Sequence, residues 1–302
     1  MYKPYGVIPP IITPFDENGG VDYAALAKMA VHLVDNGVHG LFPLGTTGEF
    51  YAINDEQFIK ILETVRDAVA GKTNRYGKPI QLIAGCSHIT TREVCRLIKL
   101  VEQVGGYDAV SVLTPMFVSQ TQDELYNYYK TIADSTAMPV IMYNNKPKTN
   151  VTIEPATVAK LAEIPNIIGV KDSTGDMTNT EEYLRLTRGM DFNVMMGRDT
   201  LIYAALCYGA KGAIASCANV APRVAVDIYE KFKAGDHAGA LEAQFKFSAL
   251  RISTNMGTFP VVLKEALKLI GHDCGDCVEP IQPLNDAQRE KLRGVLTGMG
   301  LL

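Results

Sequence analysis

The chain has 302 residues, of which 47% are hydrophobic and 21% are charged, and this composition excludes a mostly disordered protein. Its net charge of −4 comes without a basic excess, which argues against nucleic acid and against an anionic membrane surface as partners. The length suits either two average domains or one large α/β barrel.

The expected location is the cytoplasm. Prolines run through the apolar part of the first fifteen residues, which have no small-residue cleavage site and so do not resemble a signal peptide. The longest apolar runs are far shorter than the ~20 residues that span a bilayer. The cysteines at positions 86, 95, 207, 217, 274 and 277 are scattered, as is typical of reduced core thiols. Cys274 and Cys277 have CxxC spacing but no second pair, so we interpret them as a loop coincidence and not as a metal site.

Short apolar runs typical of buried strands recur along the chain. They lie at residues 6–13, 40–45, 80–86, 109–114, 140–143, 167–171, 193–197 and 212–216. Segments with apolar residues at helical spacing alternate with them, at residues 23–36, 55–70, 91–104, 122–135, 154–163, 178–188, 199–208 and 221–234. Asn54 and Thr90 are candidate helix caps.

Eight such βα units predict a parallel sheet closed as a (β/α)8 TIM barrel, in preference to an open doubly wound sheet. The first strand is not followed by a GxGxxG pattern, and a Walker A loop is also missing, which weakens the nucleotide-binding alternative. After the last unit the pattern changes to three helices without strands, at residues 236–256, 259–269 and 286–296. We therefore predict a catalytic barrel over residues 1–234 and a C-terminal three-helix extension over residues 235–302.

Lys171 is the first candidate for chemistry. It ends the apolar run of the sequence IIGVKDST at residues 167–174, so a strand would aim it into the protein interior. A poorly solvated ammonium has a lowered pKa, and the free amine can attack a carbonyl. The alternative is an ordinary solvated lysine, which is the common case for this residue type.

The chemistry of a TIM barrel lies at the carboxyl ends of its strands, and polar residues collect at the predicted ends here. The second strand ends in GTTGE at residues 45–49, a turn whose amides and hydroxyls suit a carboxylate or phosphate. The fifth ends at Tyr143, which can relay protons, and the sixth at Lys171. The seventh ends in Gly197, Arg198 and Asp199. The eighth strand, residues 212–216, has the sequence GAIAS.

Together these motifs resemble the pyruvate-dependent class I aldolases, the family of dihydrodipicolinate synthase and N-acetylneuraminate lyase. The motifs that carry the resemblance are GTTGE at 45–49, YN at 143–144, GVKDSTGD at 169–176 and GAIAS at 212–216, in the order and spacing of that family. The resemblance implies that Lys171 forms an imine with pyruvate or another 2-oxo acid, that Tyr143 shuttles the proton and that Thr46 is a third catalytic residue. It further implies that Thr46, Thr47 and their backbone amides hold the carboxylate, with Gly45 as another substrate-binding residue, and that Ile214 offers its carbonyl near the imine. It implies no metal and no organic cofactor.

Two departures from the family pattern concern the second substrate. The synthase usually has two tyrosines after Thr114 and Pro115, whereas this chain has Met116 and Phe117, and phenylalanine cannot carry a proton. Lys148 stands where the synthase commonly has an arginine for the aldehyde's carboxylate, and lysine lacks the bidentate fork.

Other positions are similar to those of the sialate lyase branch. Ser173, Asp199 and Ser216 would meet substrate hydroxyls, and Arg198 would meet a distal anion or form a rim salt bridge. Three hypotheses stay open at this point: condensation of pyruvate with aspartate semialdehyde, cleavage of a 2-keto-3-deoxy sugar acid or sialate-type substrate, and a barrel that only binds an oxo acid. The resemblance also implies a homotetramer, built as a dimer of dimers.

Overall fold

The computed structural model describes residues 2–302 and contains an eight-stranded parallel sheet in the order β1-β8-β7-β6-β5-β4-β3-β2. The strands are β1 (Gly6–Val7), β2 (Gly40–Leu41), β3 (Gln81–Gly85), β4 (Ala109–Leu113), β5 (Val140–Asn144), β6 (Ile167–Asp172), β7 (Asn193–Met196) and β8 (Gly212–Ala213). Backbone hydrogen bonds also join the two ends of this series: His39 N donates to Val7 O at 2.8 Å, and Phe42 N donates to Pro9 O at 2.9 Å. The sheet therefore closes into the predicted barrel.

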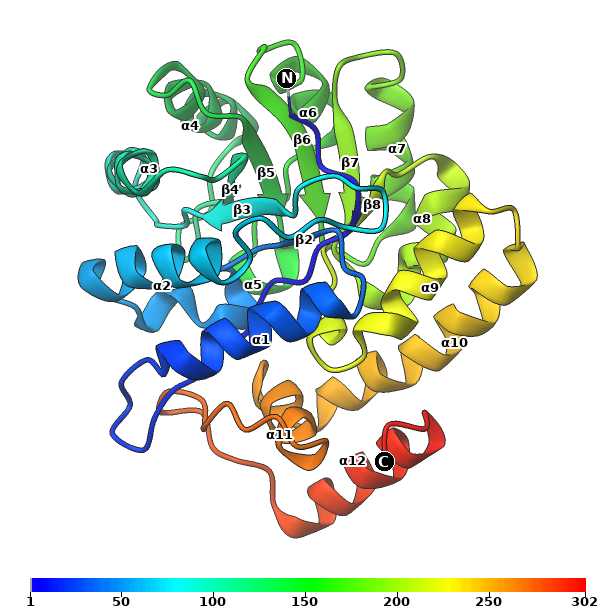
Figure 1. Cartoon of the computed structure of the whole chain (residues 1–302). Coiled ribbons are helices and arrows are strands. Elements are labelled where there is room, and N and C mark those ends of the chain that lie inside the picture. The colour runs from blue at the N-terminus through cyan, green and yellow to red at the C-terminus, as the bar shows by residue number, and fades with distance from the viewer. Residues whose placement is uncertain (1) are drawn as a thin grey trace.

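Helices follow the strands around the outside of the barrel (Figure 1). They are α1 (Tyr23–Asp35), α2 (Asp55–Ala68), α3 (Thr91–Val104), α4 (Gln122–Asp134), α6 (Pro155–Leu161), α7 (Met177–Leu186), α8 (Ile202–Tyr208) and α9 (Pro222–Lys233). A short additional helix, α5 (Lys146–Thr149), follows β5. The strand ends also carry 3-10 turns: η1 (Thr46–Gly48), η2 (Phe50–Ala52), η3 (Asp199–Leu201) and η4 (Ser216–Asn219).

The first, second and eighth strands are shorter than predicted, for identifiable reasons. Pro9 and Pro10 have no N–H to donate, so β1 ends at Val7 although the chain continues alongside β2. β2 ends at Leu41; Pro43 has no N–H to donate, and Leu44 has a positive φ of 62°, which turns the chain away from the predicted strand path. The chain winds into η4 from Ser216 and so leaves β8. Of the two candidate caps, Asn54 forms a capping box with Gln57, whereas the side chain of Thr90 makes no capping hydrogen bond.

The interior of the barrel is filled with side chains that the successive strands contribute. This inner cluster consists of Ile8, Phe42, Ile83, Ala109, Ile141, Ile168, Met195 and Ile214, each at most 1% exposed. The larger apolar cluster lies between the strands and the outer helices. Burial on both faces explains why the strands are apolar without alternation.

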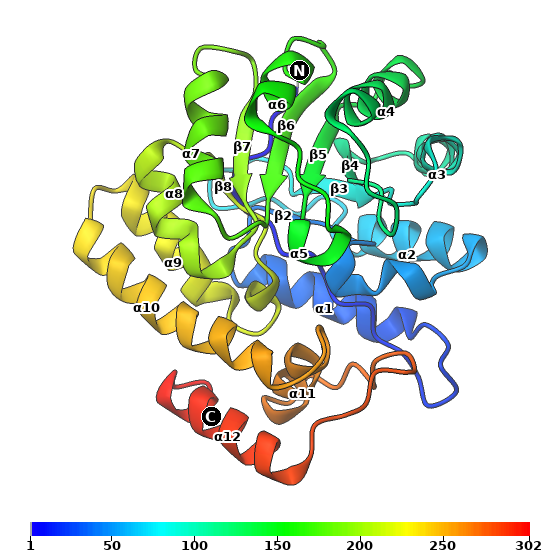
Figure 2. The same ribbon diagram turned by 180° about the vertical axis from the view of Figure 1, so that it is seen from behind.

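The C-terminal segment adds α10 (His237–Ser253), the 3-10 turn η5 (Thr254–Met256), α11 (Val261–Leu269) and α12 (Asp286–Gly298). In Figures 1 and 2 the arrowheads of β6 and β7 point toward the end of the barrel where α11 lies. The extension therefore lies at the end where barrel enzymes carry their chemistry. The division of the chain at residue 234 stays a prediction.

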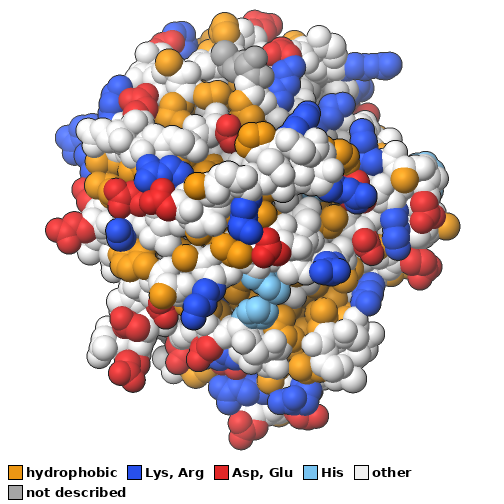
Figure 3. Space-filling model, viewed as in Figure 1, with side chains coloured by type: hydrophobic (Ala, Val, Ile, Leu, Met, Phe, Trp, Pro, Cys, Tyr) orange, Lys and Arg blue, Asp and Glu red, His pale blue; other side chains and the backbone are white. Residues whose placement is uncertain are grey.

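The surface carries both signs of charge. Figure 3 shows Lys and Arg side chains interspersed with Asp and Glu side chains on one face of the molecule. Among the helices of residues 2–302, none combines the length and the apolar character needed to cross a bilayer.

Candidate active site

Lys171 lies near the end of β6 and is only 3% exposed. Its Nζ atom is 4.0 Å from the centroid of the Tyr143 ring and 5.1 Å from that of Phe42. Burial lowers the pKa of the Lys171 ammonium, and Tyr143 and Asp199 oppose this shift without cancelling it. More of the amine is therefore free near neutral pH than for a lysine on the surface.

Tyr143 is the neighbour of Lys171 on the adjacent strand, since the two residues pair in register between β5 and β6. Its hydroxyl accepts a hydrogen bond from Asn145 Nδ2 at 2.8 Å and lies 3.5 Å from Thr46 Oγ1. Burial raises the pKa of this phenol, but the Lys171 charge and the hydrogen bonds from Thr46, Ser173 and Lys171 outweigh burial, so the pKa is lowered overall. The phenol is thus placed to exchange a proton with the amine.

The residues that follow Tyr143 and Lys171 hold the two strand ends together. Asp172 accepts hydrogen bonds from Thr180 Oγ1 at 2.7 Å, from Thr174 N at 3.1 Å and from Asn144 Nδ2 at 3.3 Å. Because side chains alternate along a strand, Asn144 and Asp172 face away from the barrel interior that Tyr143 and Lys171 face. This network explains why asparagine and aspartate directly follow the two reactive side chains.

The threonine turn, residues 45–49, begins where β2 leaves the sheet. A Cβ on Gly48 would lie 2.9 Å from Ile11 O, which requires glycine there, and Thr13 Oγ1 donates to Gly48 O at 2.7 Å. At the far end of the turn, the Glu49 carboxylate is fully buried and lies 2.8 Å from Nζ of Lys264 on α11. The turn is therefore held from the first strand and from the extension.

Ser173 and the end of β7 approach each other closely. A Cβ on Gly197 would come within 2.0 Å of Ser173 Oγ, so this hydroxyl occupies the space that glycine leaves. The next residues form a charged group: Asp199 Oδ1 accepts a hydrogen bond from Cys217 N at 2.9 Å, and Oδ2 accepts one from Ser216 Oγ at 3.1 Å. Asp199 Oδ2 also lies 3.5 Å from Nε of Arg251, which comes from α10.

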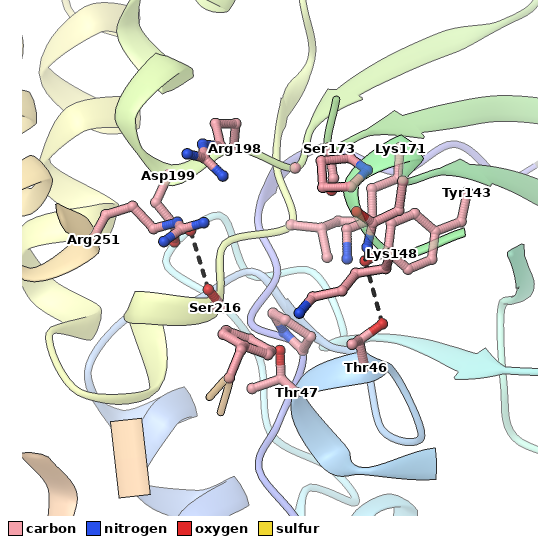
Figure 4. A pocket seen from close by; sticks show the side chains of 16 residues that line it. Thr46, Thr47, Tyr143, Lys148, Lys171, Ser173, Arg198, Asp199, Ser216 and Arg251 are labelled. Carbon is pink, nitrogen blue, oxygen red and sulfur yellow. Dashed lines mark hydrogen bonds and ion pairs between the residues drawn. The ribbon is translucent and has the colours of Figure 1, made fainter. Parts of the chain in front are cut away.

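These side chains line one cavity of about 90 Å³ (Figure 4). Of the candidates from the sequence, it brings together Thr46, Thr47, Tyr143, Lys148, Lys171, Ser173, Gly197, Arg198, Asp199, Ile214 and Ser216. Its remaining lining residues, Pro10, Asn145, Pro147, Arg251 and Phe259, were not predicted.

Two candidates lie outside this lining. Gly45 begins the threonine turn and is not among the lining residues; a Cβ added to it would lie 3.3 Å from the Phe42 ring. Phe117 is 93% exposed with a φ of +75°, so it does not contact the cavity of its own chain. Asn145 could have been found as a direct neighbour of the Tyr143 motif, whereas the sequence has no local signal that brings Arg251 or Phe259 to a strand end.

Within residues 2–302, His, Cys, Asp and Glu side chains form no group of three or more that could hold a metal ion. Cys274 and Cys277 are free and buried, and burial raises the pKa of each thiol to about 12.

Comparison with known proteins identifies the family. The model of the dihydrodipicolinate synthetase family matches residues 3–299. The 4-hydroxy-tetrahydrodipicolinate synthase of Thermodesulfovibrio yellowstonii is 35% identical over 302 residues, which is 100% of both chains.

Solved structures agree with this match. The dihydrodipicolinate synthase of Thermotoga maritima superposes with a TM-score of 0.93 at 31% identity, covering 100% of both chains. YagE, a prophage protein of the dihydrodipicolinic acid synthase family from E. coli K12, was solved with pyruvate and gives a TM-score of 0.92 at 29% identity, covering 99% of both chains. The barrel and the resemblance expected from the sequence are both confirmed. The chain belongs to the dihydrodipicolinate synthetase family and is a lyase of the class I aldolase type.

Proposed function

We propose that Lys171 condenses with the ketone of pyruvate or of a longer 2-oxo acid, and that the enzyme makes or breaks a carbon–carbon bond through the resulting imine. The observation that supports this most directly is the burial of the Lys171 amine beside the phenol of Tyr143, with Nζ 4.0 Å from the ring centroid. An amine with a lowered pKa is the nucleophile that such chemistry needs.

The reaction proceeds in two stages. The free amine attacks the ketone carbon, and the carbinolamine loses its hydroxyl as water to give a protonated imine. For cleavage, Tyr143 as phenolate takes the proton of the C4 hydroxyl while the protonated imine accepts the electron pair of the C3–C4 bond, which leaves an enamine and an aldehyde. The enamine then takes a proton at C3, and water hydrolyses the imine to release pyruvate and the free Lys171 amine. Addition to an aldehyde runs the same steps in reverse. Tyr143 donates the proton that leaves with water and takes one back from the attacking amine, and its hydrogen bonds to Asn145 and Thr46 fix its position.

The carboxylate of the oxo acid would lie in the threonine turn. Thr46 and Thr47 line the cavity together with Lys171, and their hydroxyls and amides are suitable donors for an oxyanion. Anchoring the carboxylate there makes the attack of Lys171 effectively intramolecular. The carbonyl of Ile214, which also lines the cavity, would lie beside the imine.

For the second substrate, we propose a hydroxylated aldehyde released from a 2-keto-3-deoxy acid. The hydroxyls of Ser173 and Ser216 line the cavity and can bind substrate hydroxyls, while Phe117 supplies no hydroxyl for a proton relay. Aspartate semialdehyde is the second candidate, because Lys148 can bind its carboxylate and curated relatives bear the name of that synthase.

Reduction of the protein with borohydride in the presence of pyruvate tests the first step. It should add one reduced pyruvate to Lys171, as shown by mass spectrometry of peptides, and Lys171→Ala should stay unmodified. An unmodified wild-type protein would refute the proposal. Pyruvate release from a panel of 2-keto-3-deoxy acids, measured beside condensation with aspartate semialdehyde, identifies the second substrate. A barrel that only binds oxo acids would form the adduct and turn over neither.

We further propose that the chain forms a homotetramer in the cytoplasm. The 93% exposure of Phe117 supports an additional contact at this loop in the assembly, and the six free cysteines support a reducing compartment. Light scattering on the purified protein should give four times the 32.9 kDa chain mass.

A further inference from the structure

The cavity contains more positive charge than pyruvate can neutralise. Besides Lys171, three cationic side chains line it, namely Lys148, Arg198 and Arg251, and Asp199 is the single carboxylate among its lining residues. The carboxylate of a 2-oxo acid would neutralise only one of the cations that Asp199 leaves uncompensated. An excess of positive charge in a partly buried cavity is unfavourable, so this composition favours the binding of a second anionic group.

Two cations of the lining, Lys148 and Arg198, have no anion of their own within residues 2–302; Nζ of Lys148 lies over the Phe259 ring, whereas Arg198 lies beside Arg251. No side-chain hydrogen bond or ion pair engages the Arg198 guanidinium anywhere in the described chain, residues 2–302. The side chain packs against Gly175, where a Cβ would lie 3.7 Å from Nε. Partial burial and the neighbouring Arg251 lower the pKa of Arg198, and the nearby Asp199 opposes this shift without cancelling it. A bound oxyanion would relieve both effects.

Arg251 is held in place while keeping donors available. Gln244 and Arg251 lie two helical turns apart on α10 and therefore on the same face. Gln244 Nε2 donates to the carbonyl of Asp199 at 2.8 Å, and Gln244 Oε1 accepts from Tyr203 N at 2.9 Å, which fixes η3 and α8 to α10. The distance of 3.5 Å from Arg251 Nε to Asp199 Oδ2 is an ion pair but is longer than a good hydrogen bond. Nη1 of Arg251 donates to Thr254 Oγ1, but Nη2 makes no hydrogen bond within residues 2–302 and thus remains able to bind an oxyanion.

The arrangement places this charge away from the reacting end. Figure 4 shows Arg198, Asp199 and Arg251 on one side of the cavity and Lys171, Tyr143 and Thr46 on the other. We propose that the substrate carries a second oxyanion, a carboxylate or a phosphate, at the end remote from its ketone, and that Arg198 and Arg251 bind it. The inference rests on the proposed imine chemistry and defines the substrate class as dianionic 2-oxo-3-deoxy acids.

Three six-carbon 2-oxo-3-deoxy acids that differ only at C6 test this assignment: one ends in a hydroxymethyl group, one in a carboxylate and one in a phosphate ester. Release of pyruvate should show a kcat/KM for one of the anionic acids about tenfold or more above that for the neutral acid, because charge-assisted hydrogen bonds are the strong ones. Which anionic acid is preferred identifies the oxyanion. Arg198→Gln and Arg251→Gln should remove the preference, chiefly through a higher KM, whereas Arg188→Gln, an exposed arginine outside the cavity, should retain it.

Trapping with pyruvate and borohydride separates this inference from the proposed function. If the wild-type protein forms no Lys171 adduct, the proposed function itself fails. If the adduct forms but the neutral acid is cleaved as well as both anionic acids, or none of the three is cleaved, the distal anion site is refuted. An unchanged preference in Arg198→Gln also refutes it. This variant decides the matter even if Arg251→Gln fails to fold, because the Arg198 side chain has no partner to leave unpaired.

Discussion

Replacing Lys264 by methionine tests the buried ion pair that joins the threonine turn to the extension. The two side chains are 1% and 0% exposed, and Lys264 Nζ lies 2.8 Å from Glu49 Oε1. Lys264 also donates to Asp276 O at 2.8 Å and lies 4.3 Å from the centroid of the Phe15 ring. Glu49 Oε2 accepts a hydrogen bond from Val278 N at 2.9 Å, but Oε1 accepts no hydrogen bond within the described chain. Without Lys264, Oε1 would be left without a partner.

The expected loss of stability follows from this geometry. At 2.8 Å the attraction is about 6 kcal/mol for an effective dielectric constant near 20. Desolvation offsets part of it, and removal of one partner of a buried pair typically costs about 3–5 kcal/mol. For a chain of 302 residues this corresponds to a decrease in Tm of about 5–8 °C. We expect a higher KM for pyruvate as well, because Glu49 ends the turn that contains Thr46 and Thr47.

Thermal and urea unfolding followed by circular dichroism measure the first effect, with Lys246→Met, an exposed lysine of α10, as the matched control. Glu49→Gln combined with Lys264→Met should recover part of the loss, since the glutamine removes the unpaired charge and can still accept from Val278 N. A loss below about 1 kcal/mol in Lys264→Met would refute the reasoning, since a buried carboxylate cannot lose its only cation at so small a cost. So would a double variant that is no more stable than Lys264→Met alone.

Three further predictions concern single side chains. Tyr143→Phe should slow reductive trapping of pyruvate by about a hundredfold or more through loss of the proton shuttle. Because Tyr143 raises the pKa of Lys171, the midpoint of the pH dependence of trapping should move further below 10.5, the ordinary pKa of lysine. An upward move of this midpoint would contradict the reasoning. Gly197→Ala should raise the KM for a 2-keto-3-deoxy acid while adduct formation with pyruvate persists, because the new Cβ would lie 2.0 Å from Ser173 Oγ and would displace this hydroxyl. An unchanged KM would exclude the Ser173 hydroxyl from substrate binding. Iodoacetamide should alkylate Cys207 first, since it is the exposed thiol, and peptide mapping that finds another cysteine modified earlier would refute this.

The sequence was sufficient for the barrel because the fold depends on patterns that repeat along the chain. Apolar runs buried on both faces and amphipathic segments between them leave few other ways to cover the strands. The ends of the strands were harder to predict, because they depend on single backbone events. At Leu44, beyond the end of β2, a positive φ turns the chain away from the predicted strand path, and no residue-type preference would place a leucine in that conformation.

The difference between nearby and distant residues in the sequence also explains which lining residues of the cavity could be predicted. Lys171 and Tyr143 end adjacent strands, so once the barrel is predicted their proximity follows from strand register. Arg251 and Phe259 belong to the extension, and their approach to Asp199 and Lys148 depends on the packing of α10 and on the chain between α10 and α11. The three helices at the C-terminal end were interpreted as an appended subdomain. The extension contributes Arg251 of α10 and Phe259, which precedes α11, to the cavity, and through Lys264 it holds the turn that would bind the carboxylate. The C-terminal extension, which has no recognisable motif, therefore lines the part of the cavity that we propose selects the second substrate.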